Sequence, residues 1–128
     1  MSDQKPLGGT RWAFAAGNMP DGSTGHEPEF TSRDELCFLN TTGQDAVAKV
    51  SVYHVDHEPV GPYRIDVAAR RVLHVRVNDL MDPQAVPLGE PYGVTVTSEI
   101  PLVIQMRHVD TRQAELAVAV NTGFTGNH

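Results

Sequence analysis

The chain of 128 residues contains a single cysteine, Cys37, and this scarcity excludes two kinds of covalent or metal cross-link. One cysteine cannot form an internal disulfide, and it cannot supply a zinc site built from several thiolates. Cys37 lies in the apolar stretch Leu36–Leu39, which predicts a buried, inert thiol rather than a reactive one.

Long apolar runs and an excess of basic charge are also missing. The longest apolar segments, such as Leu102–Ile104 and Leu116–Val120, are far shorter than the roughly 20 residues of a membrane helix. We therefore expect no membrane insertion. The start Met1–Pro6 has no apolar signal-peptide segment, which favours a cytoplasmic location. Lys and Arg total 10 against 16 Asp and Glu, and the net charge of −6 disfavours nucleic acid as a partner.

Frequent chain breakers and short alternating segments are what the sequence does contain, with 11 glycines and 9 prolines. We predict an all-β, antiparallel two-sheet sandwich, jelly-roll-like, with about seven to nine strands. The expected organisation is a flexible leader over 1–9, one sandwich domain over 10–122 and a flexible tail over 123–128. Strands are expected at Arg11–Ala16, Asp34–Thr41, Ala46–Val55, Ala69–Val77, Tyr92–Ser98, Leu102–Val109 and Glu115–Asn121.

The connections between these strands carry their own predictions. Thr42–Asp45 is expected to join its flanking strands as a hairpin. Glu58–Pro62 should turn, because two prolines and a glycine cannot continue a central strand. Gly17–Glu29 reads as a long loop, and one helical turn is expected after Asn78.

Catalytic signatures such as Gly-x-Ser-x-Gly, a phosphate-binding loop or His-Glu-x-x-His are absent, so we expect a protein that is not an enzyme and has no cofactor. The segment His54–Glu58 contains imidazoles and carboxylates that suit a divalent ion. On a strand, however, His54 and Asp56 share a face while His57 points the other way. The segment also leads into a turn, so a solvated turn is favoured and no metal site is expected.

Two polar rows remain as candidates for binding. His74, Arg76 and Asn78 alternate along one strand and form either the solvent side of a sheet or the lining of a cavity. Asn78 also has a local explanation, because asparagine initiates turns by bonding nearby backbone amides. Gln105 and Arg107 share a face just after the apolar Leu102–Ile104, as at a cavity mouth. Further on, Asp110 and Arg112 are compatible with an ordinary turn ion pair.

Several blocks of sequence resemble the sensory rhodopsin transducer family, and the resemblance extends from about Thr10 to about Val120. The Val-Gly-Pro-Tyr-Arg and Asn-Asp-Leu blocks occur in the expected order and spacing. The chain departs from the family pattern at Arg107-His108, where Thr-Arg is usual, and at Leu116, where Asn is usual. The matching blocks are Arg11–Ala15, Glu58–Arg64, Ala69–Arg71, His74–Leu80 and Asp110–Glu115.

The resemblance implies an all-β homotetramer that acts as a signalling module and binds a small polar metabolite, sugar-like or a carboxylate. It also leaves open a protein adaptor for a rhodopsin or other receptor, or a DNA-binding regulator. For the tetramer we expect the C-terminal strand, with Ala117–Val120, at a subunit interface. Trp12 would offer a stacking surface, although core packing with Phe14 explains it equally well. The expected ligand-binding residues are Trp12, Arg64, His74, Arg76, Asn78, Gln105 and Arg112.

Overall fold

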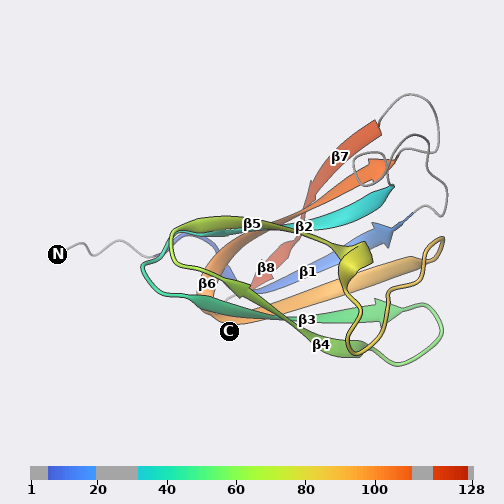
Figure 1. The fold of residues 1–128 in the computed structure, drawn as a ribbon, viewed down its shortest axis with the longest axis horizontal. Coiled ribbons are helices and arrows are strands. Elements are labelled where there is room, and N and C mark those ends of the chain that lie inside the picture. Colours follow the sequence, from blue (N-terminus) through green and yellow to red (C-terminus); the bar gives the residue numbers. More distant parts are fainter. Residues whose placement is uncertain (1–5, 20–31, 111–116, 127–128) are drawn as a thin grey trace.

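β-Strands make up most of the computed structural model, which describes residues 6–19, 32–110 and 117–126 (Figure 1). The predicted all-β antiparallel class is confirmed, with eight strands and one short 3₁₀ helix in the described residues. The elements are β1 (Gly9–Asn18), β2 (Arg33–Asn40), β3 (Ala46–His54), β4 (Val60–Val67), β5 (Arg71–Arg76), η1 (Val77–Asp79), β6 (Pro91–Asp110), β7 (Ala117–Thr122) and β8 (Phe124–Gly126).

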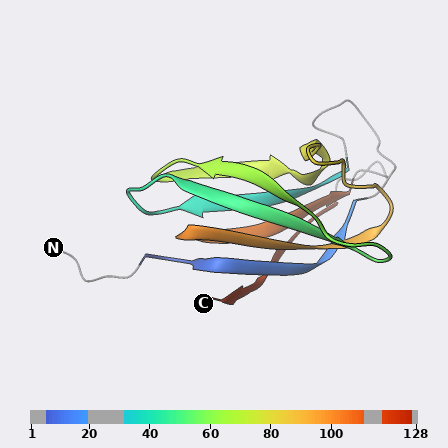
Figure 2. The ribbon, with the colours of Figure 1, turned by 90° about the horizontal axis from the view of Figure 1, so that it is seen from below.

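Strand β6 belongs to two sheets. Its first part pairs with β3 and β1, and these strands form sheet A in the order β4-β3-β6-β1-β8. Its second part pairs with β2 and β7, and these form sheet B in the order β5-β2-β6-β7. Figure 2 shows β5 and β2 on one side of the molecule and β1 and β8 on the other.

The length of β6 differs from the sequence prediction of two separate strands, Tyr92–Ser98 and Leu102–Val109. The structure has one strand of 20 residues. Pro101 lies where β6 leaves sheet A, at a register shift between the pairs Arg11–Thr97 and Gly9–Leu102. Strands that pass between packed sheets commonly bend at such irregularities, so the proline marks a bend rather than an end.

The core lies between the two sheets and follows the two-residue period of the strands. Leu36 and Phe38 point inward from β2, while Val50 and Val52 do so from β3. On β6 the even-numbered residues are buried from Tyr92 to Val96 in the first part of the strand and from Leu102 to Met106 in the second. The odd-numbered residues of β2 and β6 consequently lie on the outer faces of the sheets, where the functional candidates are found.

The link from β2 to β3 is not the predicted hairpin. β2 pairs with β5 and β6, and β3 pairs with β4 and β6, so the link crosses from sheet B to sheet A. Buried Asn40 holds this crossing: its Nδ2 donates to Gln44 O at 2.8 Å and Val67 O at 3.2 Å. Its Oδ1 accepts from the backbone N–H of Thr42 at 3.0 Å. A single amide side chain thus satisfies the backbone at the crossing.

Strand β4 was missed from the sequence, where Glu58–Pro62 was expected to form only a turn. The strand begins at Val60, and Gly61 and Pro62 form a bulge opposite Ser51, between the pairs Val52–Val60 and Val50–Tyr63. Because β4 is an edge strand, the missing N–H of Pro62 leaves no central ladder bond unmade. Gly61 has φ 156°, and a Cβ there would lie 2.8 Å from Val50 O, so the bulge requires glycine.

The C-terminal segment adds two strands. β7 overlaps the predicted strand Glu115–Asn121, and β8 pairs with β1 in a segment where no strand was expected. η1 agrees with the helical turn expected near Asn78. Most of the predicted loop Gly17–Glu29 lies outside the described residues. Within the described residues, no helix has the length and apolar character needed to cross a membrane.

Candidate functional site

The outer face of sheet B brings together three of the residues predicted for binding. Strand β2 lies between β5 and β6, so the outward side chains of β2 lie between those of β5 and those of β6. One row across the sheet contains His74, Cys37 and Gln105, and the next contains Arg76, Glu35 and Arg107. We call these residues the sheet B cluster; its members are Glu35, Cys37, His74, Arg76, Gln105 and Arg107.

Glu35 is the electrostatic centre of this cluster and is only 5% exposed. Arg33 Nε donates to its Oε2 at 2.8 Å, and Arg107 Nε donates to its Oε1 at 2.6 Å, with a second nitrogen of Arg107 also in contact. Burial alone would raise the pKa of the Glu35 carboxyl. The hydrogen bonds and charges of Arg33 and Arg107 outweigh that effect and hold its pKa below the usual value. Glu35 is therefore ionised at neutral pH.

Cys37 is half-buried on this outer face, so the prediction of a buried thiol was wrong in its detail. Its neighbours Leu36 and Phe38 enter the core, and the alternation of the strand turns Cys37 the other way. Partial burial raises the pKa of the thiol, the charge of Arg107 counteracts this in part, and Glu35 adds to the increase. The thiol is protonated at neutral pH.

Arg76 and Asn78 carry polar atoms that their surroundings leave unmatched. Asn78 Nδ2 donates to Ser32 O at 3.2 Å, which is a contact with the distant start of β2 and not the local turn bond expected from sequence. Asn78 Oδ1 and Arg76 Nε are buried and have no hydrogen-bond partner among the described residues. Arg76 Nε lies 3.8 Å from Asp79 Oδ2, close enough for an ion pair but too far for a hydrogen bond.

The remaining predicted binding residues do not join the sheet B cluster. Trp12 lies on β1 in sheet A, its ring stacks on Phe14 with 6.2 Å between centroids, and its Nε1 donates to Leu102 O at 3.0 Å. This geometry is the packing that the sequence left open as an alternative. Arg64 is exposed on β4, where its Nε pairs with Asp66 at 3.1 Å. Arg112 lies outside the described residues.

His54 is half-buried at the end of β3, and residues 55–58 form an exposed turn after it. The rings of His54 and His57 stack with centroids 4.0 Å apart, and His57 Nδ1 is 2.9 Å from the Asp56 carboxylate. Partial burial lowers the pKa of His54, and the neighbouring His57 lowers it further. His57 is thus occupied by Asp56, which fits the solvated turn favoured from sequence.

A second buried carboxylate, Asp34, lies on the inner side of β2 and was not singled out from the sequence. Its Oδ2 accepts from Tyr92 OH at 2.5 Å and from the backbone N–H of Asn18 at 3.1 Å. Its Oδ1 is 2.7 Å from His108 Nδ1. Burial and the adjacent negative charge of Asp34 raise the pKa of Tyr92 far above the usual value, so its hydroxyl remains a donor. Asp34 therefore ties β1, β2 and β6 together.

Comparisons with known proteins show to which family this fold belongs. The family model described as Anabaena sensory rhodopsin transducer matches residues 7–125. The solved structure of the Anabaena sensory rhodopsin transducer is 43% identical, with a TM-score of 0.75, over 86% of this chain and 96% of that one. The chain belongs to the Anabaena sensory rhodopsin transducer family.

A structure from Thermotoga maritima, protein 1070, shows how widely the transducer fold extends. It has a TM-score of 0.84 at 24% identity, over 94% of this chain and 97% of that one, and at this identity it supports the fold alone. No curated protein matches the chain. In this member of the transducer family, four of the five blocks that carry the sequence resemblance lie in β1, at the start of β4, and in and around β5 and η1, and the fifth continues from the end of β6 beyond the described residues.

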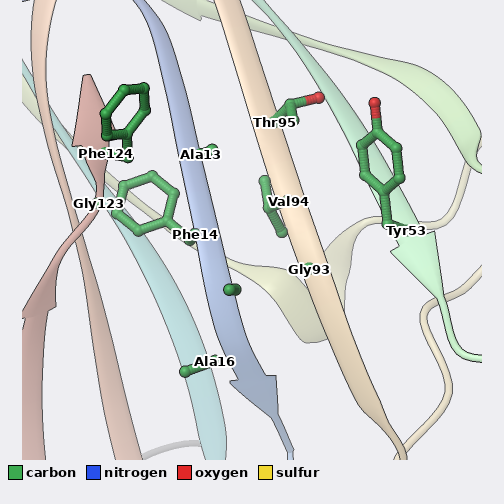
Figure 3. A pocket seen from close by; sticks show the side chains of 10 residues that line it. Ala13, Phe14, Ala16, Tyr53, Gly93, Val94, Thr95, Gly123 and Phe124 are labelled. Atoms are coloured by element: carbon green, nitrogen blue, oxygen red, sulfur yellow. The ribbon is translucent and has the colours of Figure 1, made fainter. Parts of the chain in front are cut away.

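This transducer-family chain has a second, very different surface on the outer face of sheet A. A depression of about 560 Å³ lies over β8, β1, β6 and β3. Figure 3 shows Tyr53 on one side and Phe124 on the other, with Ala13 and Gly93 on the strands between them. Tyr53 is 44% exposed and Phe124 is 78% exposed. We call this surface the sheet A shelf; its outward side chains are Ala13, Ala15, Tyr53, Thr95 and Phe124, with Gly93 between them.

Sequence reasoning found four of the six members of the sheet B cluster of this transducer-family protein and missed two. The four that stood out as polar groups in alternating strands are His74, Arg76, Gln105 and Arg107. Glu35 and Cys37 did not stand out as binding residues, because both adjoin the apolar residues of the same segment. Only the pairing of β2 with both β5 and β6 places these side chains in the same rows. The available signal was a glutamate followed directly by four apolar residues in the same strand.

Proposed function

We propose that the chain is a non-enzymatic, cytoplasmic signalling module that binds a small polar metabolite at the edge of the sheet B cluster. The proposal is supported by two buried atoms, Arg76 Nε and Asn78 Oδ1, that have no hydrogen-bond partner in the part of the chain that the structure describes. A buried donor or acceptor without a partner costs about 1–3 kcal/mol, so such atoms are usually satisfied by water or a ligand.

The two atoms also define what the ligand must offer. Arg76 Nε needs an acceptor, and a carboxylate is the acceptor that a guanidinium binds best. Asn78 Oδ1 needs a donor, which a hydroxyl group supplies. His74 and Gln105 are exposed in the adjoining row and could reach further hydroxyls. A hydroxylated carboxylic acid of sugar size satisfies both requirements, and a neutral sugar satisfies one.

A thermal-shift comparison tests this proposal with a matched pair of compounds, gluconate and glucose, within a wider panel of sugars and hydroxy acids in buffer containing EDTA. We expect an acid to raise the melting temperature of the wild-type protein more than its neutral counterpart does. Arg76→Ala should abolish the increase. Arg71→Ala is the control, because Arg71 is exposed on the same strand and its side chain donates to the backbone O of the adjacent Arg70. Equal shifts in wild type and Arg76→Ala would refute the proposal.

A protein adaptor is the second candidate, favoured by the sheet A shelf. Its floor of small side chains between two exposed aromatic rings suits a flat apolar partner surface. The relative named a sensory rhodopsin transducer makes a membrane receptor the natural partner to test. Binding to a detergent-solubilised microbial rhodopsin that is lost in Phe124→Ser would support this candidate. No binding at low salt would count against it.

Assembly into a homotetramer completes the proposal. β7 is an edge strand of sheet B, and its Val120 is 55% exposed. An exposed apolar edge favours pairing with another copy. Light scattering at micromolar concentration should give four times the chain mass of 14.0 kDa. Val118→Arg, on β7 opposite Val109, should reduce this mass without unfolding the chain. A wild-type mass near 14.0 kDa would exclude the tetramer.

A further inference from the structure

Three donor side chains of different chemistry meet within the sheet B cluster. A carboxylate oxygen of Glu35, Sγ of Cys37 and an imidazole nitrogen of His74 all lie within 4.8 Å of one another. Cys37 and His74 are directly opposite in the β2–β5 ladder, and Glu35 precedes Cys37 by two residues on the same face. Within the described residues, this is where three such groups converge.

We propose that Glu35, Cys37 and His74 form a binding site for a zinc ion. Sulfur, imidazole nitrogen and carboxylate oxygen are the three donor types that zinc uses in proteins. Zinc bonds of about 2.0–2.3 Å place tetrahedral ligand atoms roughly 3.3–3.8 Å apart. The present separations need only a modest closing of the donors. His74 is exposed and can turn toward Cys37 without disturbing the core.

The backbone around these donors is well suited to hold them. β2 is a central strand of sheet B, paired on both sides, so the positions of Glu35 and Cys37 are fixed by two ladders. Arg33 and Arg107 orient the Glu35 carboxylate, as hydrogen-bond partners commonly orient metal-binding carboxylates. Oε1 is contacted by two nitrogens of Arg107, whereas Oε2 accepts from Arg33 Nε and keeps a second lone pair that can reach a metal ion.

The same arginines also set the character of the site. Their two positive charges oppose a cation, so we expect weaker binding than at a structural zinc site. Binding places the ion on the thiolate, and the proton of the Cys37 thiol is released to solvent. Three protein donors leave one tetrahedral position open on the exposed side of the sheet. A site of this form can accept a water molecule or an oxygen of a second ligand.

The other histidine-containing cluster provides the contrast. His57 Nδ1 is held by Asp56, and its ring stacks on His54 in an exposed turn without sulfur. His57 therefore serves as a control for histidine outside the proposed site. The proposed zinc site is independent of the proposed metabolite, because metabolite binding is argued from buried atoms of Arg76 and Asn78.

Titration of untagged, reduced protein with Co²⁺ tests the zinc site directly, because a cobalt–thiolate bond absorbs in the near ultraviolet. We expect this absorption in the wild type and its loss when Zn²⁺ is added. Cys37→Ser should lack the band, and His74→Ala should weaken Co²⁺ binding at least tenfold. His57→Ala should behave as wild type. The urea midpoint of each variant checks that it is folded.

Two results would overturn the inference: no thiolate band in the folded wild type, or an unchanged band in Cys37→Ser. Equal Co²⁺ affinity in His74→Ala and His57→Ala would remove His74 from the site and so refute it as well. The metabolite screen is performed in EDTA, so a failure of metal binding leaves the result of that screen intact. A failure of the screen likewise leaves the cobalt titration informative.

Discussion

Asp34 and Glu35 are neighbours on β2, yet the strand places them in opposite environments. Asp34 points between the sheets and is fully buried, whereas Glu35 points outward and is 5% exposed. Asp34 is held by a tyrosine hydroxyl, a backbone N–H and an imidazole. Glu35 is held by two arginines whose side chains are 17% and 33% exposed. One pleat of a strand thus separates an internal brace from a surface cluster.

The difference between the two carboxylates indicates what each one does. The partners of Asp34 come from β1 and β6, and Tyr92 among them is buried, so water cannot readily take the place of the carboxylate beside its hydroxyl. The partners of Glu35 are long side chains that can turn into solvent. We therefore expect Asp34 to matter for stability, and Glu35 to matter for the arrangement of the groups around it. The following substitutions test this contrast.

The largest effect is expected for Asp34→Ala. It leaves Tyr92 OH and the Asn18 N–H without their acceptor and His108 without its carboxylate. A hydrogen-bond donor left without its acceptor in a buried site typically costs about 1–3 kcal/mol, so leaving both donors unpaired should lower the free energy of unfolding by about 2–6 kcal/mol. Urea unfolding measures this loss. Asp66→Ala, at an exposed carboxylate on β4, is the control, and a similar loss in both variants would contradict the assignment of Asp34 as a brace.

A smaller effect is expected for Tyr92→Phe, which removes only the hydroxyl that donates to Asp34. A hydrogen bond to a charged group contributes about 1.5–3 kcal/mol. Tyr63→Phe provides the comparison, because buried Tyr63 donates to the neutral carbonyl of Gln84. A bond of that kind contributes about 0.5–1.5 kcal/mol. If the two variants lose the same unfolding free energy, the charge of Asp34 does not strengthen the Tyr92 bond.

Glu35→Gln tests the outer carboxylate through its pH dependence. The folded-state pKa of Glu35 lies below the ordinary value of 4.5, so its stabilising contribution is complete above that pH and is lost as the pH falls through the folded-state pKa. At neutral pH we expect a loss of about 1 kcal/mol, because both arginines are partly solvated. The difference from wild type should shrink below pH 4.5. A difference that stays constant across this range would show that the charge of Glu35 is not involved.

The sequence predicted much of the strand framework because period-two patterns are local. The approximate positions of β1, β2, β3, β5 and β7 follow from such patterns. β4 and the continuity of β6 did not follow from these patterns, because a proline in a sequence normally indicates the end of a strand. Pro62 is tolerated because β4 lies at the edge of its sheet, and Pro101 because β6 bends there, and neither fact is visible in the sequence. The false hairpin at Thr42–Asp45 has a related cause: whether neighbouring strands pair or cross between sheets depends on distant contacts.

The same limit applies to the candidate site. His74, Arg76 and Gln105 stand out in the sequence, but their neighbours across the sheet depend on strand pairing over long separations. Cys37 and Glu35 were missed because the apolar stretch Leu36–Leu39 predicted burial and gave no sign of an outward polar face. Trp12 illustrates a different limit, since an aromatic residue in an alternating strand fits a binding surface or a core, and only the structure shows its stacking on Phe14.

The smallest effect on stability is expected at the sheet A shelf, which carries no buried carboxylate at all. Phe124 is 78% exposed on the edge strand β8, so Phe124→Ser should change the free energy of unfolding by less than about 0.5 kcal/mol. If the shelf is a docking surface, the same substitution should abolish binding to a detergent-solubilised microbial rhodopsin. Val55→Ser is the matched control, because Val55 is 77% exposed but lies in the turn after β3. Equal rhodopsin binding by both variants would show that Phe124 does not belong to a docking surface.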